Sequence, residues 1–123
     1  MNGHEALARA ILNATDRVYT VPGYPITEIG AQTGAEMVIN EKTGLEYALG
    51  DSLSGRRAAL IIKNVGVNAC VDPLLQATAQ GLVAGVLLVV GDDPDAVGSQ
   101  TSQDTRIIGE LAEIPVIEPG KDN

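Results

Sequence analysis

Residues 38–50 read VINEKTGLEYALG, a short apolar run that leads into an acid and then into a helical pattern. The acid is Glu41. A carboxylate between a strand and the following helix of an open α/β sheet lies at the carboxyl edge of the strands, where such sheets bind ligands. An acid at this position also stabilises the first helical turn through the helix dipole. Position alone therefore leaves Glu41 open as a functional residue or as a helix-start residue.

The segments around this stretch alternate between strands and helices. Apolar runs indicate five strands, at residues 17–21, 35–39, 57–63, 85–90 and 115–118. Helical spacing occurs at residues 4–14, from about Pro25 or Ile26, at 41–53, from Asn68 to about Gly81 and around 107–112. Continuous apolar runs mark strands that are buried on both faces. The sequence thus predicts a three-layer α/β/α fold with a mainly parallel sheet of about five or six strands, as one domain at 1–119 with a frayed tail at 120–123.

The composition restricts the partners of the chain. It has 16 acidic and 8 basic residues, a net charge of -8, and neither Phe nor Trp. This charge repels DNA, RNA and anionic membranes, and a chain poor in aromatic residues offers few surfaces for base stacking. We therefore expect no nucleic-acid or membrane partner. Any phosphate that the protein handles should be held mainly by another chain.

The cysteine and histidine counts argue against several kinds of site. A lone Cys70 permits neither an internal disulfide nor a multi-cysteine metal or iron–sulfur site, and we expect it to pack inside a helix. The only histidine, His4, has no His or Cys nearby in sequence and is expected at the surface, so we assign no metal. No 18-residue apolar span and no basic start of a signal peptide are present, which predicts a cytoplasmic protein.

Four polar or glycine-bearing loops should meet at one edge of the sheet, because the loops after parallel strands converge there. They are residues 22–24, 40–41, 64–68 and 91–93. Neither G-x-G-x-x-G nor a P-loop occurs, which disfavours a nucleotide-binding Rossmann enzyme. Asp92 and Asp93 stand before Pro94, a setting more typical of a solvated turn or helix cap than of a metal site.

Self-contained nucleophilic catalysis is not indicated by the sequence. No serine lies in a G-x-S-x-G setting, and the single histidine is far from the predicted edge. Lys63, at the end of a predicted strand, is either a Schiff-base lysine or a basic group at the rim of the sheet, for example one paired with a carboxylate.

Residues 40–68, from Asn40-Glu41 to Asn64-Val65-Gly66-Val67-Asn68, resemble the pyrimidine-binding domain of thiamine-diphosphate enzymes. The resemblance is in particular to the indolepyruvate ferredoxin oxidoreductase α-subunit type of 2-oxoacid oxidoreductase. Further matches lie in residues 3–9, in Pro22-Gly23 with Pro25 and Glu28, in Asp72-Pro73-Leu74, and in Asp92-Asp93-Pro94 with Ser99-Gln100 and residues 103–106. They cover nearly the whole chain in the order of the family.

This resemblance implies a role for each matching residue. Glu41 would hydrogen-bond N1′ of the cofactor's aminopyrimidine and so activate thiamine diphosphate for attack on a 2-oxo acid. The other cofactor contacts would be Pro22, Gly23, Asn64, Gly66 and Asn68, and the substrate pocket would contain Tyr24 and Gln100. Tyr24 departs from the family, which tends to carry a threonine there, so it would fill or reshape that pocket. Such a Glu41 requires a surface that covers it.

The resemblance also implies a partner. The sequence contains neither the Gly-Asp-Gly segment of a diphosphate-binding domain nor a cysteine cluster for a ferredoxin-like module. The chain thus resembles one half of a split decarboxylase or ferredoxin oxidoreductase, inactive alone, as in the related sulfopyruvate decarboxylase α-type subunits. A separate diphosphate-binding subunit would hold Mg²⁺ in an α2β2 or higher hetero-oligomer. The alternatives are a noncatalytic binding or assembly module with this fold and a flavodoxin-like regulatory domain.

Overall fold

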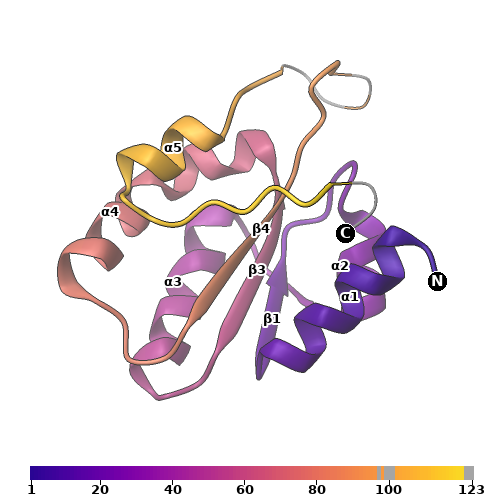
Figure 1. The fold of residues 1–123 in the computed structure, drawn as a ribbon. Helices are drawn as coiled ribbons and strands as arrows, with labels where there is room; N and C mark the ends of the chain where they lie inside the picture. The colour runs from indigo at the N-terminus through magenta and orange to yellow at the C-terminus, as the bar shows by residue number, and fades with distance from the viewer. Residues whose placement is uncertain (97, 99–101, 121–123) are drawn as a thin grey trace.

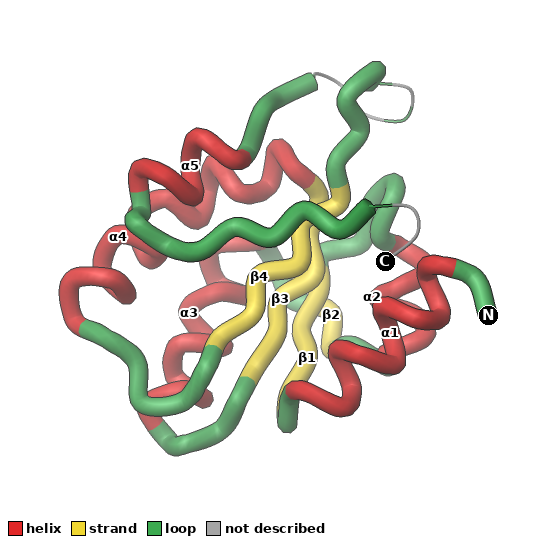
Figure 2. The backbone as a smooth tube through the Cα atoms, in the orientation of Figure 1, coloured by secondary structure: helices red, strands yellow, loops and turns green. Residues whose placement is uncertain are grey.

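The computed structural model describes residues 1–96, 98 and 102–120, which form a parallel sheet between two layers of helices (Figure 1). Four strands make up the sheet in this part of the chain, in the order β2-β1-β3-β4, and every neighbouring pair is parallel (Figure 2). The strands are β1 (Arg17–Thr20), β2 (Glu36–Met37), β3 (Ala58–Lys63) and β4 (Val86–Gly91). The predicted α/β class is confirmed.

The helices divide between the two faces of the sheet. They are α1 (Gly3–Ala14), α2 (Thr27–Thr33), α3 (Glu41–Leu53), the 3₁₀ helix η1 (Asn64–Cys70), α4 (Val71–Gln80) and α5 (Arg106–Leu111). Helices α1 and α2 cover one face, where Ile11, Ile26 and Ile29 pack against Ala59 and Ile61 of β3. The opposite face carries α3, η1, α4 and α5. Consecutive β3 side chains alternate between these two cores, as the period of a strand requires.

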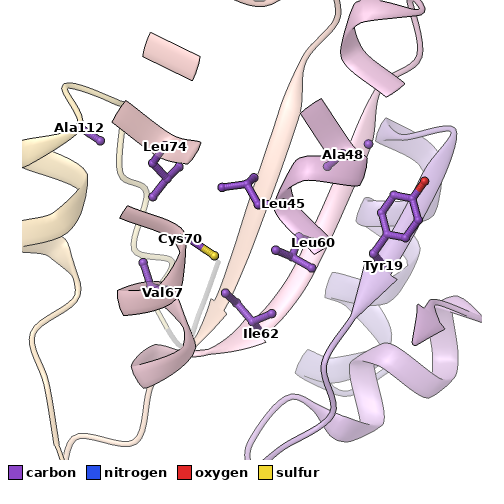
Figure 3. Packing of buried hydrophobic residues seen from close by; sticks show 10 residues of the cluster. Tyr19, Leu45, Ala48, Leu60, Ile62, Val67, Cys70, Leu74 and Ala112 are labelled. Carbon is purple, nitrogen blue, oxygen red and sulfur yellow. The ribbon is translucent and has the colours of Figure 1, made fainter. Parts of the chain in front are cut away.

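The core on the α3 side is aliphatic and closely packed (Figure 3). Leu45, Leu60 and Ile62 are at most 1% exposed and meet Cys70 and Leu74 from the η1–α4 segment. Burial of each such leucine or isoleucine side chain stabilises the fold by about 1.5–3 kcal/mol. Cys70 is therefore a packing residue, as the sequence predicted. This core holds the carboxyl end of β3 in place, directly below the loops at that edge.

Local sequence explains where α1 and α3 begin and end. Asn2 and Glu5 form a capping box at the start of α1, and Asn40 caps α3 by accepting a hydrogen bond from the Thr43 amide at 2.8 Å. After α3, Gly55 adopts a φ of 81°, a conformation that glycine reaches without strain. The predicted helix at residues 41–53 is confirmed at both ends.

The predicted fifth strand at residues 115–118 is wrong, because these residues are extended but form no strand. Pro115 lacks an amide hydrogen for a sheet ladder. The segment instead follows α5: the Ile114 amide donates to the Gly109 carbonyl at 3.1 Å, and Arg106 pairs with Glu118 at 3.2 Å. The described sheet therefore has four strands, fewer than the five or six expected.

β4 is also less buried than its apolar sequence predicted. It is an edge strand, since β3 is its one neighbour among the described strands, and Leu87 is 42% exposed. The second predicted strand is shorter than expected, with β2 covering two residues. No helix in the described parts of the chain is long and apolar enough to span a bilayer.

Candidate functional site

The order of the strands creates a crevice between the carboxyl ends of β1 and β3. From β1 the chain crosses through α2 to β2 on one side, and from β3 it crosses through η1 and α4 to β4 on the other. Helices α2 and α4 lie on opposite faces of the sheet (Figure 1). Open α/β sheets bind ligands at such a switch point, outside the carboxyl ends of the strands. We call this place the β1–β3 crevice.

Glu41 contacts the backbone that leaves β3. It is the first residue of α3, and its side chain lies against Gly66 of η1. A Cβ atom added at Gly66 would lie 2.7 Å from Glu41 Cγ and 3.2 Å from Oε1, distances that leave no room for a methyl group. Glu41 is half-buried, whereas Gly66 is buried. The contact places a carboxylate at the edge of the sheet, on the α3 side of the segment after β3.

Gly23 contacts β3 from the opposite side. It follows β1, and a Cβ atom there would lie 2.7 Å from Cδ and 3.1 Å from Cγ of Lys63. The neighbouring Pro22 and Tyr24 are exposed. A Cβ atom at Gly98 would lie 2.6 Å from Tyr24 Cδ1, so the tyrosine ring packs against the backbone of the loop after β4.

A set of amide side chains links the η1 segment to the chain before α5. Gln103 donates through Nε2 to the Asn64 carbonyl at 3.2 Å and accepts through Oε1 from Asn68 Nδ2 at 2.8 Å. Asn64 is fully buried, and its Nδ2 donates to Asp92 Oδ1 at 3.3 Å. Asn64 Oδ1 is buried and has no hydrogen-bond partner among the described residues. These bonds connect the ends of β3 and β4.

The predicted convergence of the four loops is confirmed by these contacts. Gly23 meets Lys63, Glu41 meets Gly66, and Asn64 meets Asp92. Asn68 is exposed and bonded to Gln103 rather than aimed into the crevice. Gln100 lies outside the described residues. The sequence reasoning gave no role to Gly98 or Gln103, whose contacts join segments that are distant in sequence.

The thiol of Cys70 lies close enough to Glu41 for the two groups to interact electrostatically. Burial raises the pKa of the Cys70 thiol to about 12, and the charges of Glu41 and Glu46 contribute further. Because the thiolate is the nucleophilic form of cysteine, a thiol with this pKa is inert at neutral pH. Cys70, the last residue of η1, packs in the apolar core and is not a reactive group.

Other charged groups at this edge are paired or lie elsewhere. Lys42 is 3.3 Å from Asp72, and His4 is 2.9 Å from Glu28 on the α1–α2 side. Half of the His4 side chain is exposed, as the sequence predicted. Within the described ranges, no group of three or more His, Cys, Asp or Glu residues has the arrangement of a metal site.

A large hollow of the described structure lies elsewhere, on the α3–α5 side. This β4 cleft has a volume of about 1140 Å³ and lies between β4, α4, α5 and residues 114–118. Its lining is largely aliphatic, with Leu45, Leu88 and Ile108 among its walls. Glu41, Lys63 and Gly66 are not part of it.

The fold is of the open parallel α/β class, and a carboxylate and a lysine contact the backbone near its switch point, where sheets of this class bind ligands. Comparison with known proteins then gives the particular relatives. No family model matches the chain. Curated proteins named indolepyruvate oxidoreductase subunit IorA do match it, which confirms the resemblance to the indolepyruvate ferredoxin oxidoreductase α-subunit type.

The IorA relatives are similar to nearly the whole chain. The protein from Archaeoglobus fulgidus is 38% identical over 131 aligned residues, covering 95% of this chain and 21% of its own length. The proteins from Thermococcus kodakarensis and Pyrococcus horikoshii are 36% and 38% identical over 127 residues, with 95% of this chain and 20% of their own length covered. The chain thus spans about a fifth of the length of these curated relatives.

Proposed function

We propose that this chain is the pyrimidine-binding part, residues 1–119, of a thiamine-diphosphate-dependent 2-oxo-acid enzyme. The observation that carries the proposal is the contact between Glu41 and Gly66, which holds a carboxylate at the switch point of the sheet. The names of the relatives favour an oxidoreductase over a simple decarboxylase. The substrate class is a 2-oxo acid, for which the indolepyruvate in those names is the first candidate.

The residues at the crevice fit the aminopyrimidine end of the cofactor. Glu41 packs against Gly66 and Lys63 packs against Gly23, so both side chains are held near the carboxyl ends of the strands, where the ring would bind. The half-buried Glu41 carboxyl group can hydrogen-bond the ring nitrogen N1′ and hold a proton there. When bound, thiamine diphosphate supplies the carbon nucleophile that attacks 2-oxo acids.

Other residues of the proposed site have distinct roles. Pro22 and Gly23 would form the wall on the β1 side, and Tyr24, which is exposed and packs against Gly98, would contribute to the substrate pocket. Gln100 lies outside the described residues and is proposed for that pocket from the resemblance alone. Asn64 is buried in the present arrangement, so its contribution to cofactor binding runs through its bonds to Asp92 and Gln103. Asn68 would contact the cofactor at the outer rim, next to Gln103.

A diphosphate-binding subunit completes this proposed enzyme. With a net charge of -8, the chain is a poor ligand for a diphosphate, which we assign with Mg²⁺ to the partner. The same partner would cover Glu41 and exclude water from it. We therefore expect an α2β2 or higher hetero-oligomer in which this chain is inactive alone.

The decisive test is Glu41→Gln in the complex with its co-purified partner. The substitution keeps the size of the side chain but removes the acid that bonds N1′, so we expect 2-oxo-acid turnover to fall at least about 100-fold. Bound cofactor, measured by mass analysis of the purified complex, should be retained. Full turnover by the variant complex would overturn the catalytic role and favour the noncatalytic module.

Glu46→Gln is the matched control for this experiment. Glu46 lies on the same helix, is exposed, and does not contact the crevice backbone as Glu41 does. Turnover by the Glu46→Gln complex should equal that of the wild type. An equal loss in both variants would show that charge on α3, and not contact with the cofactor, sets the rate.

A further inference from the structure

Lys63 is held by packing at the β1–β3 crevice. It is the last residue of β3, and its aliphatic stem from Cγ to Cε runs beside Gly23, within 3.8 Å of where a Cβ atom would be. Any side chain at position 23 would displace that stem. The lysine is half-buried, and its aliphatic stem is held against Gly23 at the end of the strand.

The ammonium group of Lys63 has no carboxylate within 4.0 Å in the described part of the chain, although acids outnumber bases by two to one. The other lysine of this edge, Lys42, pairs with Asp72, and Arg106 pairs with both Asp104 and Glu118. An ammonium group without a carboxylate partner in the described chain is available to bind an anion.

The position of Lys63 relative to Glu41 indicates which anion it would meet. Glu41 contacts Gly66 in the segment that leaves β3, and Lys63 directly precedes that segment. The two residues lie against different loops, because Lys63 packs against Gly23 in the loop after β1. Tyr24, the residue after Gly23, is exposed, and its ring packs against Gly98. A ligand that reaches both contacts would meet the carboxyl group of Glu41 and the ammonium group of Lys63.

We propose that Lys63 binds the carboxylate of the 2-oxo acid in the β1–β3 crevice. This inference rests on the proposed function, because it takes the crevice to hold a 2-oxo acid. A carboxylate suits the site because a charge-assisted hydrogen bond from an ammonium group to a carboxylate is stronger than one between neutral groups. Lys63 acts here as a binding group, not as a Schiff-base nucleophile.

The kinetic test compares a 2-oxo acid as the substrate with its methyl ester as a non-reacting inhibitor in the reconstituted complex. Lys63→Met keeps most of the stem and removes the charge. For indole-3-pyruvate we expect kcat/KM to fall about 10- to 100-fold, mainly through KM. The methyl ester has no carboxylate to lose as CO2, so it is measured as a competitive inhibitor, and its Ki should be unchanged by Lys63→Met. Lys63→Arg should recover a large part of the loss, because it restores the cation. Lys42→Met should leave both kcat/KM for the acid and Ki for the ester as they are in the wild type.

A labelling experiment provides a second readout that does not depend on turnover. In the Glu41→Gln complex, indole-3-pyruvate should protect Lys63 from acetylation by acetic anhydride, while its methyl ester should not. Lys42 serves as the internal control in the same mass spectrum. This readout separates the two proposals: full turnover by Glu41→Gln overturns the proposed function, whereas protection of Lys63 by the acid alone still supports the anion site.

Three results would overturn the Lys63 proposal. The first is a weaker binding of the ester to Lys63→Met, measured by Ki, that equals the loss of kcat/KM for the acid, which would mark a structural role. The second is weaker binding of thiamine diphosphate in the variant, which would assign Lys63 to the cofactor. The third is protection of Lys63 by complex formation before any 2-oxo acid is added, which would mean that an acidic side chain of the partner is its counter-ion.

Discussion

The β1–β3 crevice and the β4 cleft lie on one small sheet and differ in nearly every physical respect. The cleft has a volume of about 1140 Å³, and its lining is largely aliphatic. In the crevice, the contacts at Gly23 and Gly66 leave no room for a single added methyl group. Glu41 and Lys63, the ionisable groups of the proposed site, belong to the crevice. The proposed site therefore does not coincide with the cleft, and strand order with close backbone contacts indicates it instead.

The largest expected effect is on activity, and it comes from Gly66→Ala, which disturbs a close contact of the crevice. The added methyl group would need space that Glu41 Cγ and Oε1 occupy, so the carboxyl group must move. A displacement of about 1 Å in a catalytic group costs on the order of 100-fold in rate, and we expect turnover of the complex to fall by roughly that factor. Steady-state kinetics of the reconstituted enzyme would measure it.

Gly50→Ala is the control for that substitution. Gly50 lies on α3, as Glu41 does, but nothing is within 4 Å of a Cβ atom added there. We expect unchanged turnover and a gain of about 0.5–1 kcal/mol in the free energy of unfolding, because alanine favours a helix over glycine. If turnover with Gly66→Ala were as high as with Gly50→Ala, the contact between Glu41 and Gly66 would have no effect on function.

Stability should distinguish the core below the crevice from the wall of the cleft. Leu60 is fully buried under α3, and Leu60→Ala should lower the free energy of unfolding by about 2–5 kcal/mol. Leu87 lines the cleft and is 42% exposed, so Leu87→Ala should cost about 1 kcal/mol or less. Urea unfolding of the purified chain would give both values. Equal losses would show that the cleft is packed as tightly as the core.

A smaller effect is expected from the pH dependence of stability at Cys70. The pKa of its thiol is raised from 9.0 to about 12, first by burial and then by Glu41 and Glu46. The stabilisation is therefore complete below pH 9 and is lost as the pH rises from 9 to 12, where the unfolded thiol ionises before the folded one. The slope that this thiol adds is at most about 1.4 kcal/mol per pH unit.

Urea unfolding at several pH values, for the wild type and for Cys70→Ala, would measure that slope. The variant should lose less stability than the wild type between pH 9 and 12. Identical slopes would mean that water reaches the thiol and that the core around Cys70 is as open to solvent as the cleft.

Local features of the fold could be predicted from sequence because local interactions determine them. The helix at residues 41–53 follows from the cap at Asn40 and the glycine at position 55, and it was predicted to the residue. The strands at residues 17–21 and 57–63 follow from short apolar runs. The meeting of four loops at one edge follows from parallel strands alone.

Long-range pairing could not be read from the same patterns. The apolar run of β4 is typical of a central strand, yet β4 is at the edge of the described sheet, and residues 115–118 pack along α5 instead of pairing with it. The site shows the same limit. Position alone left Glu41 open, and the neighbouring loops and the family resemblance pointed to it. Its contact with Gly66 and the lack of a counter-ion at Lys63 among the described residues depend on which strands are neighbours.

The parallel pairing of β1 with β3 also determines when the crevice can form during folding. Thr20 Oγ1 donates to the carbonyl of Ile61, a partner 41 residues further along the chain, and Gly66 lies beyond that point. Contacts of such sequence separation form late and slow the folding of a domain. A nascent chain would expose Glu41 long before β3 and η1 arrive to support it. Assembly with a partner subunit should therefore follow folding of the whole chain, and a partner that recognises the finished edge would select for correctly folded copies.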